Sequence, residues 1–281
     1  MKELEGDLTE ALRPMPSSQD QTPTNAVPES FVQEVQQAET GGDAAKLILL
    51  SLEVKGAAWE ADALSLIAQA QMANPPVEPP GRIVLFTGHR VDSAGRKTPR
   101  FPAAKVQVAG DAIKNALEAQ QKKNGGDDII GVAGGANGGD LLFHEVCESL
   151  GITTEIALAL PPDQFAKASV DSEDPSWNVR FTNQLNCHAD VPVLAQFPDL
   201  PEWLQFKKDY DVWQRNNLWL MSIALSFGAP NSALLALWDG QTGDGPGGTE
   251  HMVALAKEHD MEFVWLKTKE LFGLETQGVS G

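Results

Sequence analysis

Two glycine-rich stretches are the residues of this sequence best suited to holding a phosphate group. The first, GGANGGD, runs from Gly134 to Asp140, and the second, GQTGDGPGGT, runs from Gly240 to Thr249. Each follows an apolar run and precedes a helical pattern. Backbone N–H groups can approach an anion closely where no Cβ intervenes, and the start of a helix directs further N–H groups to the same place. The pattern therefore predicts two phosphate-binding turns.

Neither stretch matches a standard phosphate motif, because the sequence has no GxGxxG with a confirming acidic residue and no GxxxxGK[ST]. One glycine-rich turn between a strand and a helix can equally serve tight packing. Two such turns in the same context favour ligand binding over packing.

A third turn, Thr87-Gly88-His89-Arg90, follows the apolar run RIVLFT. Gly88 lets the chain turn, and the planar guanidinium of Arg90 suits a phosphate or a carboxylate. The alternative interpretation is a surface ion pair with Asp92.

Alternating strand and helix patterns surround these turns. We expect strands at 82–87, 128–133, 153–160, 233–238 and 262–266, and helices at 103–123, 140–150, around 215–227 and at 249–259. Near-continuously apolar strands between helices indicate a parallel sheet covered on both faces. The prediction is an α/β fold: a Rossmann-like three-layer domain with a mainly parallel sheet, preceded by a small helical N-terminal segment. Its three turns should then meet at one sheet edge.

The chain divides by composition into four parts. We expect a mostly disordered N-terminus at 1–29, a helical segment at 30–72, a proline-rich linker at 73–81 and the nucleotide-binding domain at 82–281. The helical segment offers only apolar spacing, so a docking element, an oligomerisation device and a buttress on the sheet all stay open.

Charge and composition exclude several classes of function. The net charge of −18 provides no basic surface for nucleic acid, so we expect none as a partner. No run of about eighteen apolar residues and no signal peptide is visible, so we expect no membrane association and a cytoplasmic protein. Cys147 and Cys187 lie too far apart in sequence to suggest shared chemistry. His144 and His251 lack a third ligand, so we expect no metal site.

The order TGHR, then GGANGGD opening a helix, then PGGT opening another helix resembles the SLOG superfamily. This superfamily of Rossmann-like nucleotide-binding domains includes the LOG phosphoribohydrolases and the DNA-processing protein A type. The chain is more narrowly similar to a bacterial subgroup of multidomain proteins in which a helical, repeat-like region precedes the domain. The motifs that carry this similarity are FTGHRVD, GGANGGDLLFHEVC, ASV with Trp177 and Phe181, RNNLW and ALWDGQTGDGPGGTEHM. The resemblance spans about 82–266 and implies a nucleoside monophosphate, an NAD-derived nucleotide or a signalling nucleotide as ligand.

One departure from the LOG pattern bears on catalysis. LOG enzymes carry PGGxGTxxE, whereas this chain has PGGTE at 246–250, and the position three residues after Thr249 is Met252. The characteristic catalytic glutamate is therefore missing from its place. Arg90 and a carboxylate from Asp140, Glu145 or Glu250 are the candidates for catalysis.

The sequence predicts a sensor-type nucleotide-binding protein that requires no cofactor. The alternatives are a LOG-like nucleotide N-glycosidase and a scaffold whose glycine turns are only structural. We also expect a homo-oligomer and a protein partner or effector at the N-terminal helices. Arg215 and Asn216, with Asn217, begin a helix, where an N-cap and a solvent face are the alternative to ligand contact. The predicted ligand-binding residues are Thr87, Gly88, His89, Arg90, Gly134, Gly135, Asn137, Gly138, Asp140, Asp239, Gly245, Gly247, Gly248, Thr249, Glu250, Arg215 and Asn216.

Overall fold

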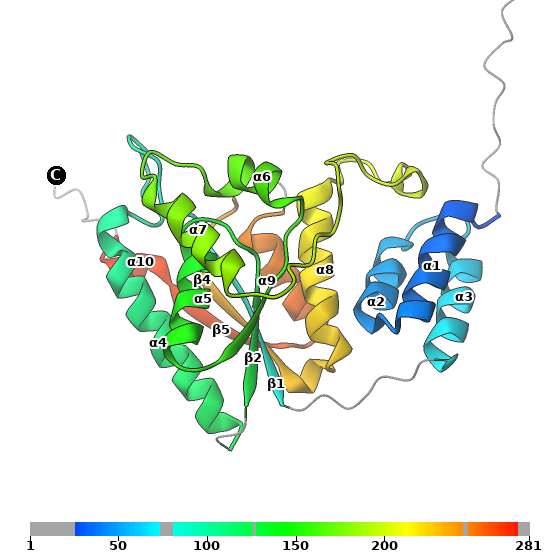
Figure 1. The fold of residues 1–281 in the computed structure, drawn as a ribbon, viewed down its shortest axis with the longest axis horizontal. Coiled ribbons are helices and arrows are strands. Elements are labelled where there is room, and N and C mark those ends of the chain that lie inside the picture. The colour runs from blue at the N-terminus through cyan, green and yellow to red at the C-terminus, as the bar shows by residue number, and fades with distance from the viewer. Residues whose placement is uncertain (1–25, 74–80, 126–127, 244–246, 275–281) are drawn as a thin grey trace, which may run out of the picture.

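The computed structural model describes residues 26–73, 81–125, 128–243 and 247–274. Within these ranges five parallel strands form one sheet in the order β3-β2-β1-β4-β5 (Figure 1). Their bounds are β1 Arg82–Gly88, β2 Ile129–Ala133, β3 Thr153–Ile156, β4 Ser232–Trp238 and β5 Glu262–Lys267. Val84 of β1 pairs in register with Gly131 of β2 on one side and with Ala233 of β4 on the other. The predicted Rossmann-like α/β fold with a parallel sheet is confirmed.

The direction in which the chain adds strands reverses beside β1. From β1 the chain adds β2 and then β3 on one side, and it later returns to add β4 and β5 on the other side. In open parallel sheets, such a reversal leaves a crevice at the carboxyl ends of the two adjoining strands, and ligands bind there. The turns after β1 and β4 therefore border the crevice of this fold.

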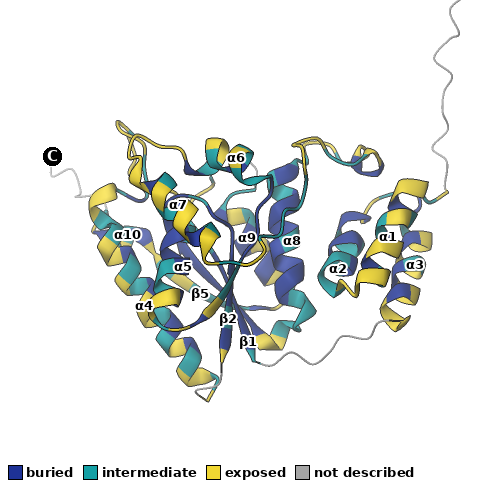
Figure 2. Cartoon of the chain, viewed as in Figure 1, coloured by how far each residue is buried: buried dark blue, intermediate teal, exposed yellow. Residues whose placement is uncertain are grey.

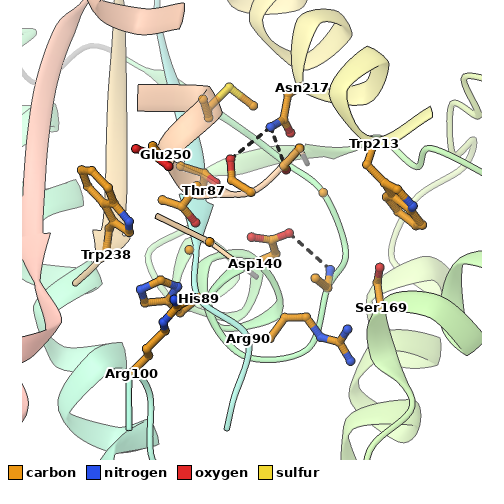
Figure 3. A pocket seen from close by; sticks show the side chains of 18 of the residues that line it. Thr87, His89, Arg90, Arg100, Asp140, Ser169, Trp213, Asn217, Trp238 and Glu250 are labelled. Carbon is orange, nitrogen blue, oxygen red and sulfur yellow. Dashed lines mark hydrogen bonds between the residues drawn. The ribbon is translucent and has the colours of Figure 1, made fainter. Parts of the chain in front are cut away.

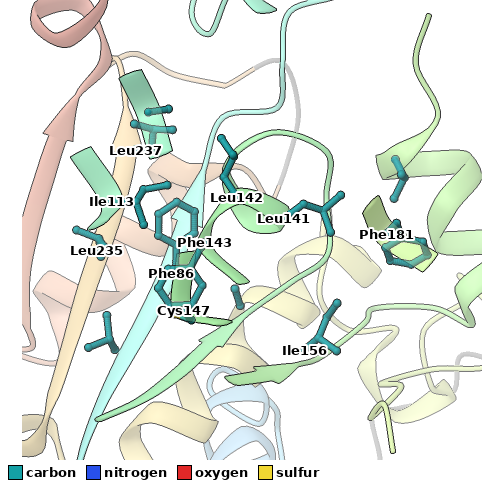
Figure 4. Packing of buried hydrophobic residues seen from close by; sticks show 14 of the residues in the cluster. Phe86, Ile113, Leu141, Leu142, Phe143, Cys147, Ile156, Phe181, Leu235 and Leu237 are labelled. Atoms are coloured by element: carbon teal, nitrogen blue, oxygen red, sulfur yellow. The ribbon is translucent and has the colours of Figure 1, made fainter. Parts of the chain in front are cut away.

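Residues of β1 alternate between two cores, as the two-residue period of a strand requires. Val84 and Phe86 face one helical layer, where the ring of Phe86 stacks on Phe143 with centroids 4.8 Å apart (Figure 4). Ile83 and Leu85 face the opposite layer. The first layer contains α4 Val106–Lys123, α5 Gly139–Ser149, α7 Ser176–Asn186 and α10 Thr268–Phe272. The second contains α8 Val212–Ser226 and α9 Thr249–Glu258.

Helix α8 is buried along most of its length (Figure 2). One side packs on the sheet and α9, and another side packs on the N-terminal helix α2. The N-terminal helices are α1 Glu29–Gly41, α2 Ala44–Glu53 and α3 Glu60–Ala73. They surround their own core, in which the ring centroid of Phe31 lies 5.0 Å from the ring centroids of Trp59 and of Trp203. Most of the predicted disordered N-terminus (1–25) and of the proline-rich linker (74–80) lies outside the described residues.

The connection between β3 and α8 differs most from the expectation of irregular structure. It contains α6 Pro162–Phe165, a π-helical turn η2 at Ala166–Val170, α7 and the short helix η3 Glu202–Leu204. The third strand also ends at Ile156, earlier than predicted, and beyond it Leu158 forms an isolated bridge with Val193. The short helices η1 Ala103–Lys105 and η4 Ala229–Asn231 precede α4 and β4. Among the described residues, none of the helices has both the length and the apolar character needed to cross a membrane.

Candidate functional site

A cavity of about 560 Å³ opens at the carboxyl ends of β1, β2 and β4. Its walls come from the turns after these strands, the π-helical turn η2, and the first turns of α8 and α9. Figure 3 shows Trp213 and Trp238 on opposite sides of this view, with Asp140 between them. The predicted site residues that line it are Thr87, Gly88, His89, Arg90, Gly134, Asp140, Asn216, Gly247, Gly248, Thr249 and Glu250.

Three arginines line the cavity from the segment that follows β1. Arg90 donates from Nη1 to the carbonyl oxygen of Ala168 at 3.0 Å, so it is held by η2 rather than by the alternative partner Asp92. Arg96 instead contacts Asp92, with its Nε 3.4 Å from Oδ1. Arg100 donates from Nη2 to the carbonyl oxygen of Thr242 at 2.7 Å. The sequence prediction missed Arg96 and Arg100, although two further arginines soon after a strand end in an acidic chain were a usable signal.

His89 and Asp239 form a buried pair beside the cavity. Nε2 of His89 lies 2.9 Å from Oδ1 of Asp239, and the other carboxylate oxygen lies 3.5 Å from Nε of Arg100. Burial lowers the pKa of His89, although the neighbouring carboxylate opposes this shift. Asp239 was predicted to bind ligand, but it does not line the cavity and instead holds two residues that do.

The glycine turn after β2 serves mainly to pack against the turn after β1. A Cβ on Gly138 would lie 2.7 Å from the backbone nitrogen of Val91, and a Cβ on Gly139 would lie 3.0 Å from Cα of Gly88. The N–H of Gly139 donates to the carbonyl oxygen of His89 at 3.0 Å. The close packing of the two turns is enough to explain why Gly138 and Gly139 are glycines, and no bound phosphate is needed for that explanation.

Three predicted ligand contacts in the turn after β2 are corrected accordingly. Gly135, Asn137 and Gly138 do not line the cavity. A Cβ on Gly135 would lie 2.9 Å from the ring of Phe181, and the Asn137 side chain donates to the carbonyl oxygen of Val170 at 2.9 Å. A bulky substitution at Gly135 would therefore disturb the core and would not report on ligand binding.

Asp140 lies in the first turn of α5 and lines the cavity. Burial raises the pKa of this carboxyl to about 7, even though the N–H groups of Ala136 and Gly88 and the charge of Arg90 favour the ionised form. The Ala136 nitrogen lies 3.3 Å from Oδ2. Asp140 is thus the carboxyl group of this cavity that is poised to exchange a proton near neutral pH.

The start of α9 opens directly on the cavity. Its N-cap residue is Gly248, so no side chain caps it, and the first N–H groups of a helix have no partner within the helix. Gly247 has a φ of +72°, and a Cβ there would lie 2.6 Å from the carbonyl carbon of Trp213. Asn217 fixes this turn, because its Nδ2 donates to the carbonyl oxygen of Gly247 at 2.8 Å. The predicted contact Gly245 lies outside the described residues.

Asp211 forms a capping box at the start of α8. The helix therefore begins at Val212, three residues before the predicted polar cluster that starts at Arg215. Trp213, Asn216 and Asn217 line the cavity, but Arg215 does not. Nε of Arg215 donates to Oε1 of Glu53 on α2 at 2.8 Å, and both side chains are buried.

Two results correct the predicted roles of Arg215 and Glu145. Burial lowers the pKa of Arg215, but the carboxylate of Glu53 more than offsets this, so the guanidinium keeps its charge and joins α8 to α2. Arg215 is therefore a packing residue. Glu145, a candidate for catalysis, also lies away from the cavity, where it pairs with Arg180.

Glu250 is exposed at the rim of the cavity, and its carboxylate accepts from the hydroxyl of Thr242 at 3.4 Å. His144 is fully buried, its Nε2 lies 2.9 Å from the carbonyl oxygen of Gly134, and burial lowers its pKa to about 4. Within the described ranges, no three His, Cys, Asp or Glu side chains gather as metal ligands would.

No protein-family model matches this chain, and no curated protein matches it. Among solved structures, it matches DNA processing protein A (DprA) from Streptococcus pneumoniae with a TM-score of 0.40 and 11% sequence identity. The match covers 86% of this chain and 82% of that chain. A similarity this weak does not show what this chain binds. The matched protein is a DNA processing protein, and the expectation that nucleic acid is excluded as a partner is withdrawn.

Proposed function

We propose that the chain binds a phosphorylated nucleotide, or an NAD-derived ligand, in the cavity at the β1–β4 crevice and does so as a sensor, without turnover. The observation that carries the proposal is the uncapped start of α9, which opens on the same cavity as three arginines. The N–H groups and the positive end of a helix dipole favour an anion at this position. A volume of about 560 Å³ lies within the range of small-molecule sites.

The phosphate is assigned to the start of α9. Thr249 lines the cavity with its hydroxyl group in the first turn of α9, where the N–H groups have no partner within the helix. Arg90 and Arg100 line the same cavity, and both are held in place by carbonyl oxygens, so their orientation precedes ligand binding. A preorganised guanidinium loses little conformational freedom when a phosphate arrives.

The sugar and the base are assigned to the side of the cavity formed by Phe165 and Trp213. Their ring centroids lie 5.9 Å apart, and both residues line the cavity. An aromatic wall beside a cationic wall suits an amphipathic ligand with a planar base and an anionic tail.

Release of small molecules from the purified, denatured protein, followed by mass spectrometry, tests the proposal directly. Isothermal titration with nucleoside monophosphates and NAD then measures the dissociation constants. The substitution Thr249→Glu places a carboxylate beside the phosphate position, and we expect it to weaken binding at least about tenfold.

Thr182→Glu is the matched control, because Thr182 is an exposed threonine on α7 that does not line the cavity. It should bind as the unmodified chain does. If no nucleotide is retained and none binds at millimolar concentration, the proposal is wrong.

Hydrolysis of the N-glycosidic bond is a second candidate, favoured by the pKa of about 7 at Asp140. In this reaction, water adds to the ribosyl carbon, the bond to the base breaks, Asp140 protonates the departing base, and the proton lost by water restores the carboxyl group. Release of free base from a nucleoside monophosphate, lost in Asp140→Asn, would support it. Stoichiometric binding with no free base after prolonged incubation would favour the sensor.

A further inference from the structure

Asn216 carries an unsatisfied hydrogen-bond acceptor at the cavity. The residue is 6% exposed and lines the cavity, and its Oδ1 is buried without a hydrogen-bond partner among the described residues. Buried side-chain polar atoms nearly always have a partner, and leaving one without is unfavourable. Because the same residue lines the cavity, the unpaired acceptor indicates that its donor arrives with a ligand.

The neighbours of Asn216 indicate which part of the ligand carries that donor. Trp213 precedes it by three residues on α8, so the two side chains lie on the same side of the helix, and both line the cavity. Phe165 continues the aromatic wall. An aromatic wall with an amide beside it is the combination that proteins use to stack a base and read its edge.

Asn217, the next residue, is already occupied. Its Nδ2 donates to the carbonyl oxygens of Gly247 and Gly248, at 2.8 and 3.3 Å, just before α9. Helix α8 therefore holds the proposed phosphate position with one amide and leaves the adjacent amide, Asn216, for the ligand.

We propose that Asn216 determines base specificity by accepting a hydrogen bond from an exocyclic amino group. This inference rests on the proposed nucleotide binding. The amino group of adenine, cytosine or guanine donates to Oδ1, whereas an oxo group at the same position presents a second acceptor and leaves both oxygens unsatisfied. The site thus selects an amino-bearing base over its oxo counterpart.

Calorimetric titration of the full chain with matched nucleotide pairs tests this selection. The pairs are AMP with IMP, CMP with UMP, and GMP with XMP, and in each pair the second member carries an oxo group where the first carries the exocyclic amino group. We expect the amino member of at least one pair to bind at least about tenfold more tightly, and the pair that shows it identifies the base.

Two substitutions separate the acceptor from the side-chain volume. Asn216→Leu removes the acceptor and should reduce the preference to within about twofold. Asn216→Asp keeps an oxygen in place and should retain the preference for the amino member. Asn183→Leu, an exposed asparagine on α7 that does not line the cavity, is the matched control and should behave as the unmodified chain.

Thermal unfolding without ligand distinguishes recognition from a structural role. Because Oδ1 has no partner to lose, Asn216→Leu should unfold at the same or a higher temperature than the unmodified chain. A clear fall would mean that Asn216 supports the fold, and the inference would be wrong.

Equal affinity for both members of every pair would also overturn the inference while leaving nucleotide binding intact. If no nucleotide binds at all, the inference fails together with the proposed function. The comparison of amino and oxo nucleotides on the unmodified chain decides the matter even if a variant does not fold.

Discussion

At the residue scale, the carboxyl group of Asp140 has the property least visible in the sequence. The GGANGGD pattern was enough to propose Asp140 as a candidate. Its pKa of about 7 depends on burial beneath the turn after β1, which comes from a distant part of the chain. A linear pattern identifies a titratable residue, but the groups that displace water from it are set by the fold.

The pH dependence of stability tests the environment of Asp140. Its pKa in the folded protein, about 7, exceeds the ordinary value of 3.8, so between these values the folded state holds a proton that the unfolded chain releases. The stability that this group contributes is fully present below the lower value and is lost as the pH rises through the higher one. Asp140→Asn should therefore gain stability relative to the unmodified chain as the pH rises from about 4 to about 7, and the gain should stay constant above that.

Urea unfolding at several pH values measures this difference. Asp111→Asn, an exposed aspartate on α4, is the control and should show no such trend. If the free energies of unfolding of Asp140→Asn and of the unmodified chain differ by the same amount at every pH, the carboxyl group is solvated.

At the element scale, the strands and long helices followed from apolar runs and helical periodicity, whereas the β3–α8 connection did not. Helix α6 has four residues and η2 five, too few for a periodic signal, yet η2 supplies the carbonyl oxygen that holds Arg90. Glycines posed a second difficulty. The same residue type serves a phosphate turn and a close backbone contact, and only the fold shows that Gly138 serves the contact.

Substitution of Gly138 by alanine should destabilise the protein for two separable reasons. Its φ of +88° is unfavourable for alanine, and the new Cβ would lie 2.7 Å from the nitrogen of Val91. Backbone strain of about 1–2 kcal/mol and overpacking of about 1–3 kcal/mol predict a loss of roughly 2–5 kcal/mol.

Gly95→Ala isolates the backbone contribution. Gly95 has a φ of +78°, but a Cβ added there would meet no atom within 4 Å, so only the strain should appear. Chemical unfolding measures the loss in the free energy of unfolding for both variants. The difference between the two losses is the contribution of the contact between the new Cβ and Val91. Equal losses in the two variants would mean that the turns after β1 and β2 can separate at little cost.

At the scale of the whole molecule, the N-terminal helices and the α/β domain are joined through α8. Glu53 of α2 is fully buried against Arg215 of α8, and Leu49 of α2 belongs to the same apolar cluster as α8. The sequence indicated helices before the sheet from apolar spacing alone. It did not indicate this contact, because Arg215 and Asn216 are adjacent in one polar cluster. Which of the two side chains faces α2 and which lines the cavity depends on how α8 packs in the fold.

Breaking this buried pair tests the connection. Glu53→Gln leaves the guanidinium of Arg215 without its main counter-charge, and we expect a loss of about 3–5 kcal/mol in the free energy of unfolding. The matched control is Glu258→Gln, which breaks the exposed pair with Lys55 and should cost less than about 1 kcal/mol. Comparable small losses in both variants would show that the Arg215 contact contributes little to holding α2 on α8.

The two-sided burial of α8 has a thermodynamic consequence for the ligand. Trp213 and Asn216 face the cavity, while Arg215 between them faces α2, so a displacement of this helix alters both contacts at once. If the proposed ligand favours one position of α8, linkage requires reciprocity: the factor by which an occupied cavity changes the docking affinity of α1–α3 equals the factor by which their docking changes the affinity for the ligand. Under that coupling, the N-terminal helices would contribute to the dissociation constant of the proposed ligand, although none of their described residues lines the cavity.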